Sequence, residues 1–128
     1  MNRKLYPSVT LSIQDDEDII FVEYAPNIEV NLELAKEIVS NRLDFAGEKM
    51  HYLILDVSNV KSITSDARTY LLDPNTGTKN ILGAAFLASN LVSALFANFF
   101  IKSRKGFPTK FFHKKNDALK WIKEIKEK

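Results

Sequence analysis

Two neighbouring hydroxyls, Thr64 and Ser65, stand where the sequence predicts that a short helix begins. The N-terminus of a helix carries free N–H groups and the positive end of the helix dipole, so it stabilises added negative charge. A phosphate on Ser65 would be favoured there, and Lys61 and Arg68 are placed to pair with it. The alternative is that Thr64 or Ser65 only caps the helix. Asp66 favours this alternative, because its carboxylate already lies in the turn that the phosphate would use.

A second feature is the segment 91–101, which is typical of a helix that is apolar on almost every side. Consecutive helical positions lie about 100° apart, so Phe96, Phe99 and Phe100 cannot all face one sheet. The excess of apolar side chains predicts a second contact surface, which would hold a protein partner, a second copy of the chain or a lipid-like ligand. The alternative is that neighbouring elements of the same chain cover this surface.

Other chemistries have little support in the sequence. There is no cysteine, which excludes disulfides and thiol catalysis and favours a cytoplasmic protein. His51 and His113 are the only histidines, and neither has a second metal ligand at a suitable spacing. The four glycines are scattered and form no phosphate-binding loop. We therefore expect no catalytic residues, no metal and no cofactor, and we interpret the chain as non-enzymatic.

Charge is divided unevenly along the chain, although the net charge is only +2. Residues 1–64 carry 6 Lys/Arg and 11 Asp/Glu, whereas residues 65–128 carry 12 and 5. The acidic run 15–18 is interpreted as a solvated hairpin tip rather than as a calcium site. The lysines after residue 101 could attract anions or acidic partners, or could form a solvated helix face. They lack the arginine-rich, aromatic-interleaved pattern of nucleic-acid binding, so no nucleic-acid partner is expected.

Hydrophobic periodicity predicts an α/β fold in which these residues are positioned. The predicted elements, in chain order, are strands at 8–14 and 19–24, a helix between Asn31 and Ala46, a strand at 51–57, a helix at 65–72, a strand at 81–88, a helix at 91–103, a strand at 110–113 and a helix capped by Asn116. Segment 59–64 is predicted to be a loop. The order ββαβαβαβα predicts a mixed, mostly parallel five-stranded sheet with helices on both faces.

The length of 128 residues predicts a single domain that spans residues 1–128. Residues 81–101 carry no charge, and a stretch of this length could cross a membrane. Ser89 and Asn90 interrupt it with a turn and helix-cap signal. We therefore interpret the stretch as a buried strand followed by a buried helix, with no membrane span.

Segment 56–60 reads Asp-Val-Ser-Asn-Val, in which Asp56 closes the predicted central strand, and segment 64–67 reads Thr-Ser-Asp-Ala. Together with the order of elements, these segments resemble the SpoIIAA-like superfamily, which holds STAS domains and anti-sigma-factor antagonists and is similar in fold to CRAL-TRIO lipid-binding domains. Members of the superfamily have Asp-Leu-Ser-Gly-Val and then Asp-Ser-Ser-Gly at a helix start. Ser65 falls on their phosphorylated serine, whereas Thr64 stands for the aspartate and Ala67 for the glycine.

The whole chain also resembles small standalone bacterial STAS/SEC14-like proteins of unassigned function. The resembling segments are 67–71, 98–100, 107–109 and 118–122. This resemblance implies a regulatory or scaffolding protein that acts by protein–protein contact, with a kinase-type regulator among the partners that it allows. The likeness to CRAL-TRIO domains implies the alternative, a binding protein for an apolar or lipid-like ligand.

We predict that the chain forms a twofold dimer through the helix at 91–101, because a twofold contact is the commonest way to cover an apolar surface. Light scattering should then give the mass of two chains. A monomer at high concentration would contradict the dimer and favour a ligand on the same surface.

Overall fold

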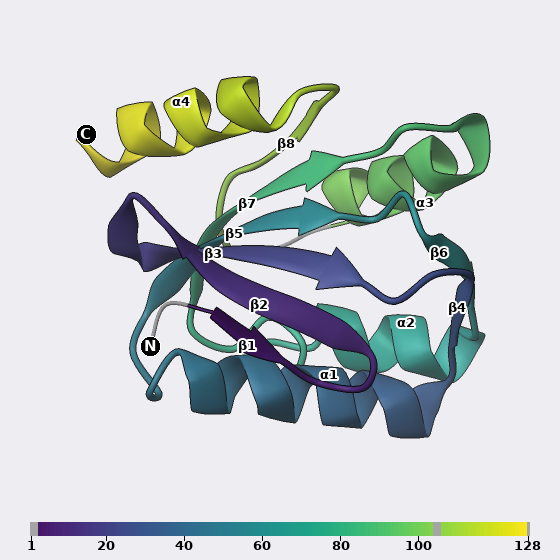
Figure 1. Cartoon of the computed structure of the whole chain (residues 1–128). Helices are drawn as coiled ribbons and strands as arrows, with labels where there is room; N and C mark the ends of the chain where they lie inside the picture. Colours follow the sequence, from purple (N-terminus) through teal and green to yellow (C-terminus); the bar gives the residue numbers. More distant parts are fainter. Residues whose placement is uncertain (1–2, 104–105, 128) are drawn as a thin grey trace.

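A six-stranded mixed sheet runs through the centre of the protein, in the order β1-β2-β3-β5-β7-β8 (Figure 1). The computed structural model describes residues 3–103 and 106–127, without the side chains of residues 91–93, 96 and 99. The strands of this sheet are β1 (Arg3–Leu5), β2 (Val9–Gln14), β3 (Asp16–Tyr24), β5 (His51–Asp56), β7 (Ile81–Leu87) and β8 (Thr109–Phe112). A separate two-stranded sheet pairs β4 (Ile28–Val30) with β6 (Val60–Ile63). The helices are α1 (Leu32–Phe45), α2 (Ser65–Leu72), α3 (Leu91–Lys102) and α4 (Lys115–Lys126).

The pairing of the main sheet changes direction at β3. Strands β1, β2 and β3 pair antiparallel, whereas β3, β5, β7 and β8 pair in parallel. Parallel neighbours need a crossover connection, and α1, α2 and α3 lie in the three connections of this part of the chain. The predicted mixed sheet, its opening hairpin and the strand followed by a helix within 81–101 are therefore confirmed.

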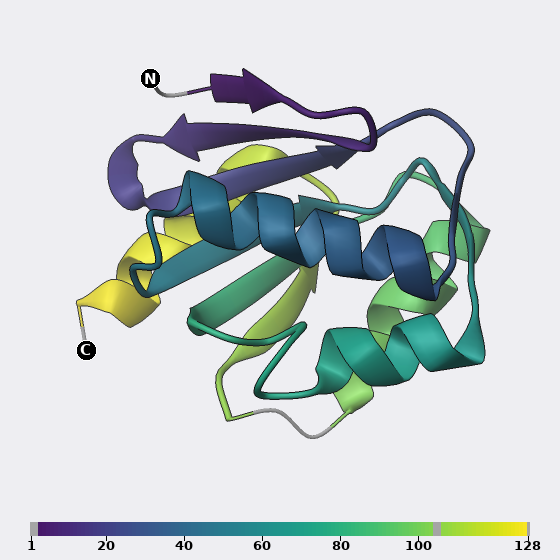
Figure 2. The same ribbon diagram turned by 90° about the horizontal axis from the view of Figure 1, so that it is seen from below.

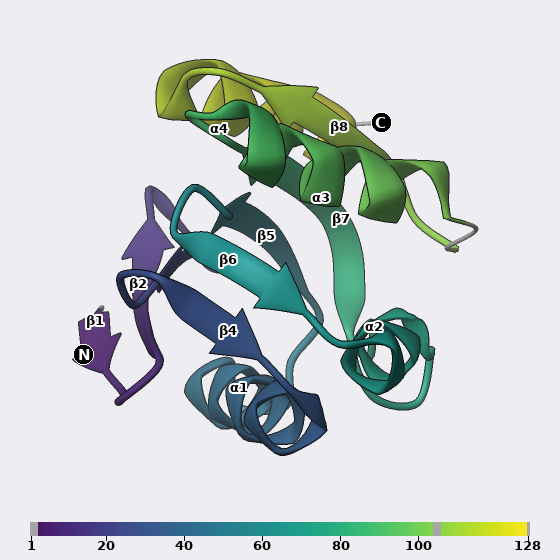
Figure 3. The ribbon, with the colours of Figure 1, turned by 90° about the vertical axis from the view of Figure 1, so that its right-hand side faces the viewer.

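The predicted number of five strands is wrong. The main sheet has a sixth strand, β1, whose three exposed residues pair with β2 at the edge of the sheet. Segment 59–64, predicted as a loop, contains β6, which pairs in parallel with β4. Figure 3 looks onto this small sheet, which lies beyond the carboxyl ends of the parallel strands. Strands of three or four residues are too short to show an alternation that periodicity could detect.

The two faces of the main sheet carry two separate hydrophobic cores. On β5, Leu53 packs in the core under α1, α2 and α3, whereas Ile54 packs in the core under α4. On β7, Ala84 packs in the core under α1, α2 and α3, and Ala85 packs in the core under α4. Successive side chains of a strand point to opposite faces, so each parallel strand must supply both cores. Figures 1 and 2 show α4 on one side of the sheet and α1 and α2 on the other.

The acidic segment lies at the exposed tip of the β2–β3 hairpin, as predicted, and is also paired with α4. Asp15 forms the turn with a φ of 65°, and Asp16 and Asp18 already belong to β3. Lys123 Nζ lies 2.6 Å from a carboxylate oxygen of Asp15. Lys126 Nζ lies 2.9 Å from Asp16 and 2.6 Å from Asp18. Part of the acidic excess of the N-terminal half is thus paired with the basic C-terminal helix.

Helix ends agree with the sequence for α1 and differ for α4. The side chain of Asn31, where the predicted helix begins, accepts the N–H of Leu34 at 2.9 Å and so caps α1. Gly47 follows the helix with a φ of 64°, a left-handed conformation that suits glycine. The last helix begins one residue before Asn116, with Lys114 at the N-cap position and no side-chain cap bond. Asn116 therefore lies in the first turn of α4 and is not its N-cap.

His51, the first residue of β5, is only 1% exposed. Its Nδ1–H donates to the carbonyl oxygen of Lys49 at 2.8 Å, and its Nε2 is buried without a partner among the described residues. Burial is the main cause that lowers the pKa of His51 to about 4, and the nearby charge of Arg42 lowers it further. The hydrogen bond to Lys49 and the charge of Asp18 act in the opposite direction. His51 is therefore neutral in the folded protein near neutral pH.

The free energy of unfolding should fall as the pH is lowered from 7 to 5. An unfolded chain binds a proton at a histidine near pH 6.5, whereas folded His51 does so only near pH 4. Protonation thus favours the unfolded chain throughout this window, and the loss should be about 2 kcal/mol at pH 5. Urea unfolding at several pH values measures it. His51→Gln should flatten the dependence, and an equal slope in the variant and the wild-type protein would exclude His51 as its source.

Candidate functional site

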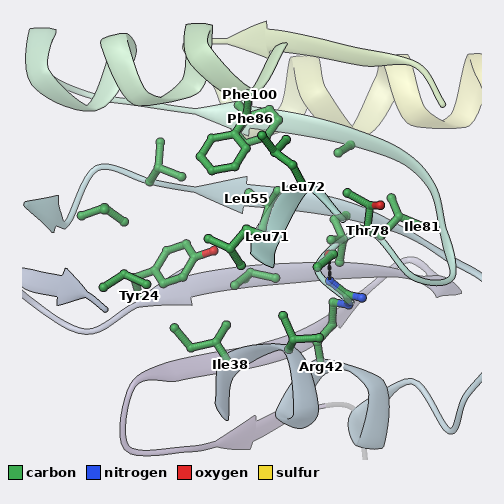
Figure 4. A pocket seen from close by; sticks show the side chains of 18 of the residues that line it. Tyr24, Ile38, Arg42, Leu55, Leu71, Leu72, Thr78, Ile81, Phe86 and Phe100 are labelled. Atoms are coloured by element: carbon green, nitrogen blue, oxygen red, sulfur yellow. Dashed lines mark hydrogen bonds between the residues drawn. The ribbon is translucent and has the colours of Figure 1, made fainter. Parts of the chain in front are cut away.

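A cavity of about 90 Å³ lies between the main sheet and helices α1 and α2, on the face away from α4 (Figure 4). Strands β2, β3, β5 and β7 supply one wall. The remaining walls come from α1 and α2, from Phe100 of α3, from β4 and β6, from the loop between α2 and β7, and from Phe107 and Thr109 at the start of β8. The lining is mostly leucine, isoleucine, valine, alanine and phenylalanine. Its polar side chains are those of Tyr24, Arg42, Thr78 and Thr109.

Arg42 is the charged residue of the cavity lining and is only 6% exposed. Its two terminal nitrogens donate to the carbonyl oxygens of Gly77 at 2.8 Å and of Lys79 at 2.7 Å. Its Nε is buried without a hydrogen-bond partner among the described residues. Burial lowers the pKa of Arg42 to about 10, opposed by the nearby Tyr24 and Tyr70. The guanidinium therefore stays positively charged near neutral pH.

Tyr24, the last residue of β3, brings a hydroxyl to the same cavity. In Figure 4 its ring lies along the cavity and its hydroxyl points toward the middle, between Leu55 and Leu71. Burial raises the pKa of Tyr24 to about 12, and the nearby charge of Arg42 opposes this rise. The hydroxyl therefore keeps its proton and can donate a hydrogen bond into the cavity.

The loop between α2 and β7 closes the cavity against Arg42. The N–H of Gly77 donates to the carbonyl oxygen of Tyr70 at 3.0 Å, which folds the loop back onto the end of α2. A Cβ at position 77 would overlap the backbone of Leu71, so glycine is required at this close approach. The loop thus presents its carbonyl groups to the guanidinium.

The structure places the predicted contact surface of α3 partly on this cavity. Phe100 lines it and stacks on Phe86 of β7, with ring centroids 6.0 Å apart. The side chains of Phe96 and Phe99 lie outside the described residues. Leu95, which the sequence analysis did not single out, is 61% exposed on the same helix. The helix therefore has an apolar residue on its outer side as well as one in the cavity.

The hydroxyl cluster forms at the N-terminus of α2, but the two hydroxyls differ in role. Thr64 is the N-cap, and its Oγ1 accepts the N–H of Ala67 at 3.3 Å. Asp66 accepts the same N–H at 2.8 Å and also the hydroxyl of Thr64. The bond from Thr64 is the main cause that holds the pKa of Asp66 below its ordinary value. Ser65 is exposed, and Arg68 donates to its hydroxyl at 3.2 Å.

Asp56 supports the turn after β5. Its carboxylate accepts the N–H of Ser58 at 3.0 Å. The hydroxyl of Ser58 in turn accepts the N–H of Ser89 at 3.0 Å, so the turns after β5 and β7 are joined. Lys61 is exposed on β6. The structure therefore brings Thr64, Ser65 and Arg68 together, whereas the contact found for Asp56 is with its own turn.

Sequence reasoning missed the cavity and did not single out Arg42 or Tyr24, two of its polar lining residues. One signal for Arg42 was present, because it follows Ala35 by seven residues and Ile38 by four. These spacings place a charged residue on the buried face of an amphipathic helix, where charges are rare unless they are paired. Tyr24 had no such signal, since an aromatic residue at the end of a strand is commonplace.

Residues 3–103 and 106–127 contain no group of three or more His, Cys, Asp or Glu side chains that could hold a metal ion. None of the helices in this part of the chain is both long enough and apolar enough to pass through a membrane.

Comparison with known proteins gives a family and a fold. Residues 11–126 match the family model described as a domain of unknown function, DUF7793. No curated protein matches the sequence. Among solved structures, the chain is similar to an uncharacterized protein of the DUF3478 family from Shewanella loihica PV-4, which is described as having a SpoIIAA-like fold. The TM-score is 0.62 over 90% of this chain and 92% of that chain, at 18% sequence identity, so the likeness shows the fold alone.

The cap assignment predicts different costs for the two hydroxyls of α2. Thr64→Ala should lower the free energy of unfolding by about 1 kcal/mol, because it removes the N-cap oxygen and the donor to Asp66. Ser65→Ala should change it by only a few tenths of a kcal/mol, on the order of a surface substitution. Urea unfolding compares them, with Thr64→Ser as the variant that keeps the cap. If Ser65→Ala lowered the free energy of unfolding more than Thr64→Ala does, the assignment of Thr64 as the cap would be wrong.

Proposed function

The chain belongs to the DUF7793 family and has a SpoIIAA-like fold, and we propose that it is a non-enzymatic binding protein for a small apolar ligand. The observation that carries this proposal is the cavity between the sheet and helices α1 and α2. Ligand sites are typically concave and apolar, with a few polar groups that orient the ligand. Arg42 and Tyr24 are such groups in an otherwise apolar lining.

The size of the cavity limits the ligand. A volume of about 90 Å³ is below that of the engineered cavity of about 150 Å³ that takes up benzene. The ligand must therefore be small, with a chain of only a few carbons, whereas a whole lipid would require α1, α2 or α3 to move apart from the sheet. We therefore narrow the lipid-like alternative of the sequence analysis to a short-chain compound.

A second candidate is the regulatory or scaffolding role by protein–protein contact that the sequence resemblance implies. Its support is the exposed surface at the start of α2, where Ser65 lies beside Arg68 and could accept a phosphate. Asp66 opposes a phosphate there, because its carboxylate already accepts the N–H of Ala67. Phosphopeptide mapping of protein purified from cells distinguishes this candidate, since the ligand proposal requires no modified Ser65.

The ligand proposal predicts that 1-butanol binds in the cavity and that filling the cavity prevents it. Leu55 lies on β5 and faces the cavity, so Leu55→Phe should reduce its volume at a cost of about 1–3 kcal/mol in stability. Titration followed by ¹H–¹⁵N NMR should shift the amide signals of Leu53 and Ala84 in the wild-type protein. Leu55→Phe should weaken this binding at least tenfold.

Leu119→Phe is the matched control, because it adds the same aromatic ring in the core under α4 on the opposite face. It should bind 1-butanol as the wild-type protein does. The proposal is wrong if the wild-type signals do not respond to 1-butanol, or if both phenylalanine variants bind equally well.

A further inference from the structure

We infer that the ligand of this cavity is a short-chain monocarboxylate, whose acid group pairs with Arg42 and accepts a hydrogen bond from Tyr24. The inference rests on the proposed function, since it names the chemical class of the ligand for the same cavity. The observations that support the inference are the position of Arg42 and Tyr24 in the lining and the hydrogen-bond donors of both residues that have no acceptor among the described residues.

The charge of Arg42 lacks an anionic partner among the described residues. The two hydrogen bonds found for its terminal nitrogens go to neutral carbonyl groups, those of Gly77 and Lys79. The ion pairs found among the described residues join Lys123 and Lys126 to the acidic β2–β3 turn, and Arg42 takes part in none of them. A buried cation without an anion is costly, and removing that cost favours the uptake of a negatively charged group.

Arg42 also has N–H donors that make no hydrogen bond among the described residues. A guanidinium carries five N–H donors, whereas the two bonds to the α2–β7 loop use two of them. Its Nε is buried and has no partner in the described part of the chain. The planar fork of an arginine matches the two oxygens of a carboxylate, which makes a carboxylate the natural acceptor for these remaining donors.

Tyr24 supplies a second donor from another wall of the cavity. No hydrogen bond of its hydroxyl is found among the described residues, and in Figure 4 this hydroxyl points into the cavity. The hydroxyl stays protonated at neutral pH, so it adds a donor without adding a negative charge. It therefore favours an acceptor group on the ligand.

The rest of the lining selects for one negative charge on a short apolar chain. Arg42 is its charged member, so a monoanion neutralises the site, whereas a dianionic phosphate would leave one negative charge uncompensated in an apolar surrounding. The apolar walls formed by Leu55, Leu71 and Phe86 suit a hydrocarbon tail. Butyrate has both properties.

The test compares butyrate with 1-butanol at pH 7, using ¹H–¹⁵N NMR titrations of the whole chain. The two probes have the same number of carbons and differ in the charged group. We expect the wild-type protein to bind butyrate at least tenfold more tightly than 1-butanol.

Tyr24→Phe, which removes one oxygen and keeps the ring, should weaken butyrate binding about threefold to tenfold and leave 1-butanol binding unchanged. Arg42→Gln should abolish the preference for butyrate.

The ratio of the two affinities separates a ligand role of Arg42 from a structural one. If Arg42 only holds the α2–β7 loop, Arg42→Gln will change the binding of both probes alike and Tyr24→Phe will change neither. That result would overturn the inference, as would wild-type protein that binds 1-butanol but not butyrate, although the proposed function would stand. Failure of 1-butanol to bind the wild-type protein would instead overturn the proposed function.

Discussion

Burial of β5 and β7 on both faces is the constraint on which the rest of the structure depends. A parallel strand covered on both sides must send alternate side chains into two cores, as Leu53 and Ile54 do. One face then needs the crossover helices α1, α2 and α3, and the other needs α4. The cavity lies on the crossover side, where three helices and the small β4–β6 sheet meet the main sheet and their side chains leave a gap.

Arg42 links this packing to the candidate site. It stands on the buried face of α1, yet it bonds to the carbonyl groups of the loop that precedes β7. The same side chain therefore fixes the loop and brings a positive charge to the cavity. A hydrophobic residue in its place could pack in the core but would leave those two carbonyl groups without their donors. The position is thus both a structural contact and a source of electrostatic selectivity.

The sequence predicts the elements with long, regular patterns and misses those that depend on distant partners. The apolar runs of β5 and β7 and the helical spacing in α1 and α4 are local signals, and the order of elements follows from them. Strands β1, β4 and β6 have three or four residues and are defined by their pairing alone. The cap at Thr64 could not be separated from one at Ser65, because either hydroxyl can serve. The cavity arises from the packing of elements, so neither its size nor the direction of Tyr24 can be read from spacing.

The contact between α4 and the β2–β3 turn has a consequence for the order of folding during synthesis. Lys123 and Asp15 are 108 residues apart, so the ribosome makes the turn early and its helical partner late. Until α4 is made, the sheet face that carries Ile19, Phe21 and Ile54 has no helix to cover it. Such an exposed apolar face on a nearly complete sheet is prone to aggregation. The opposite charges of the turn and the helix attract each other over a distance of about 8 Å at physiological salt, which favours docking of the late helix on the face that it must cover.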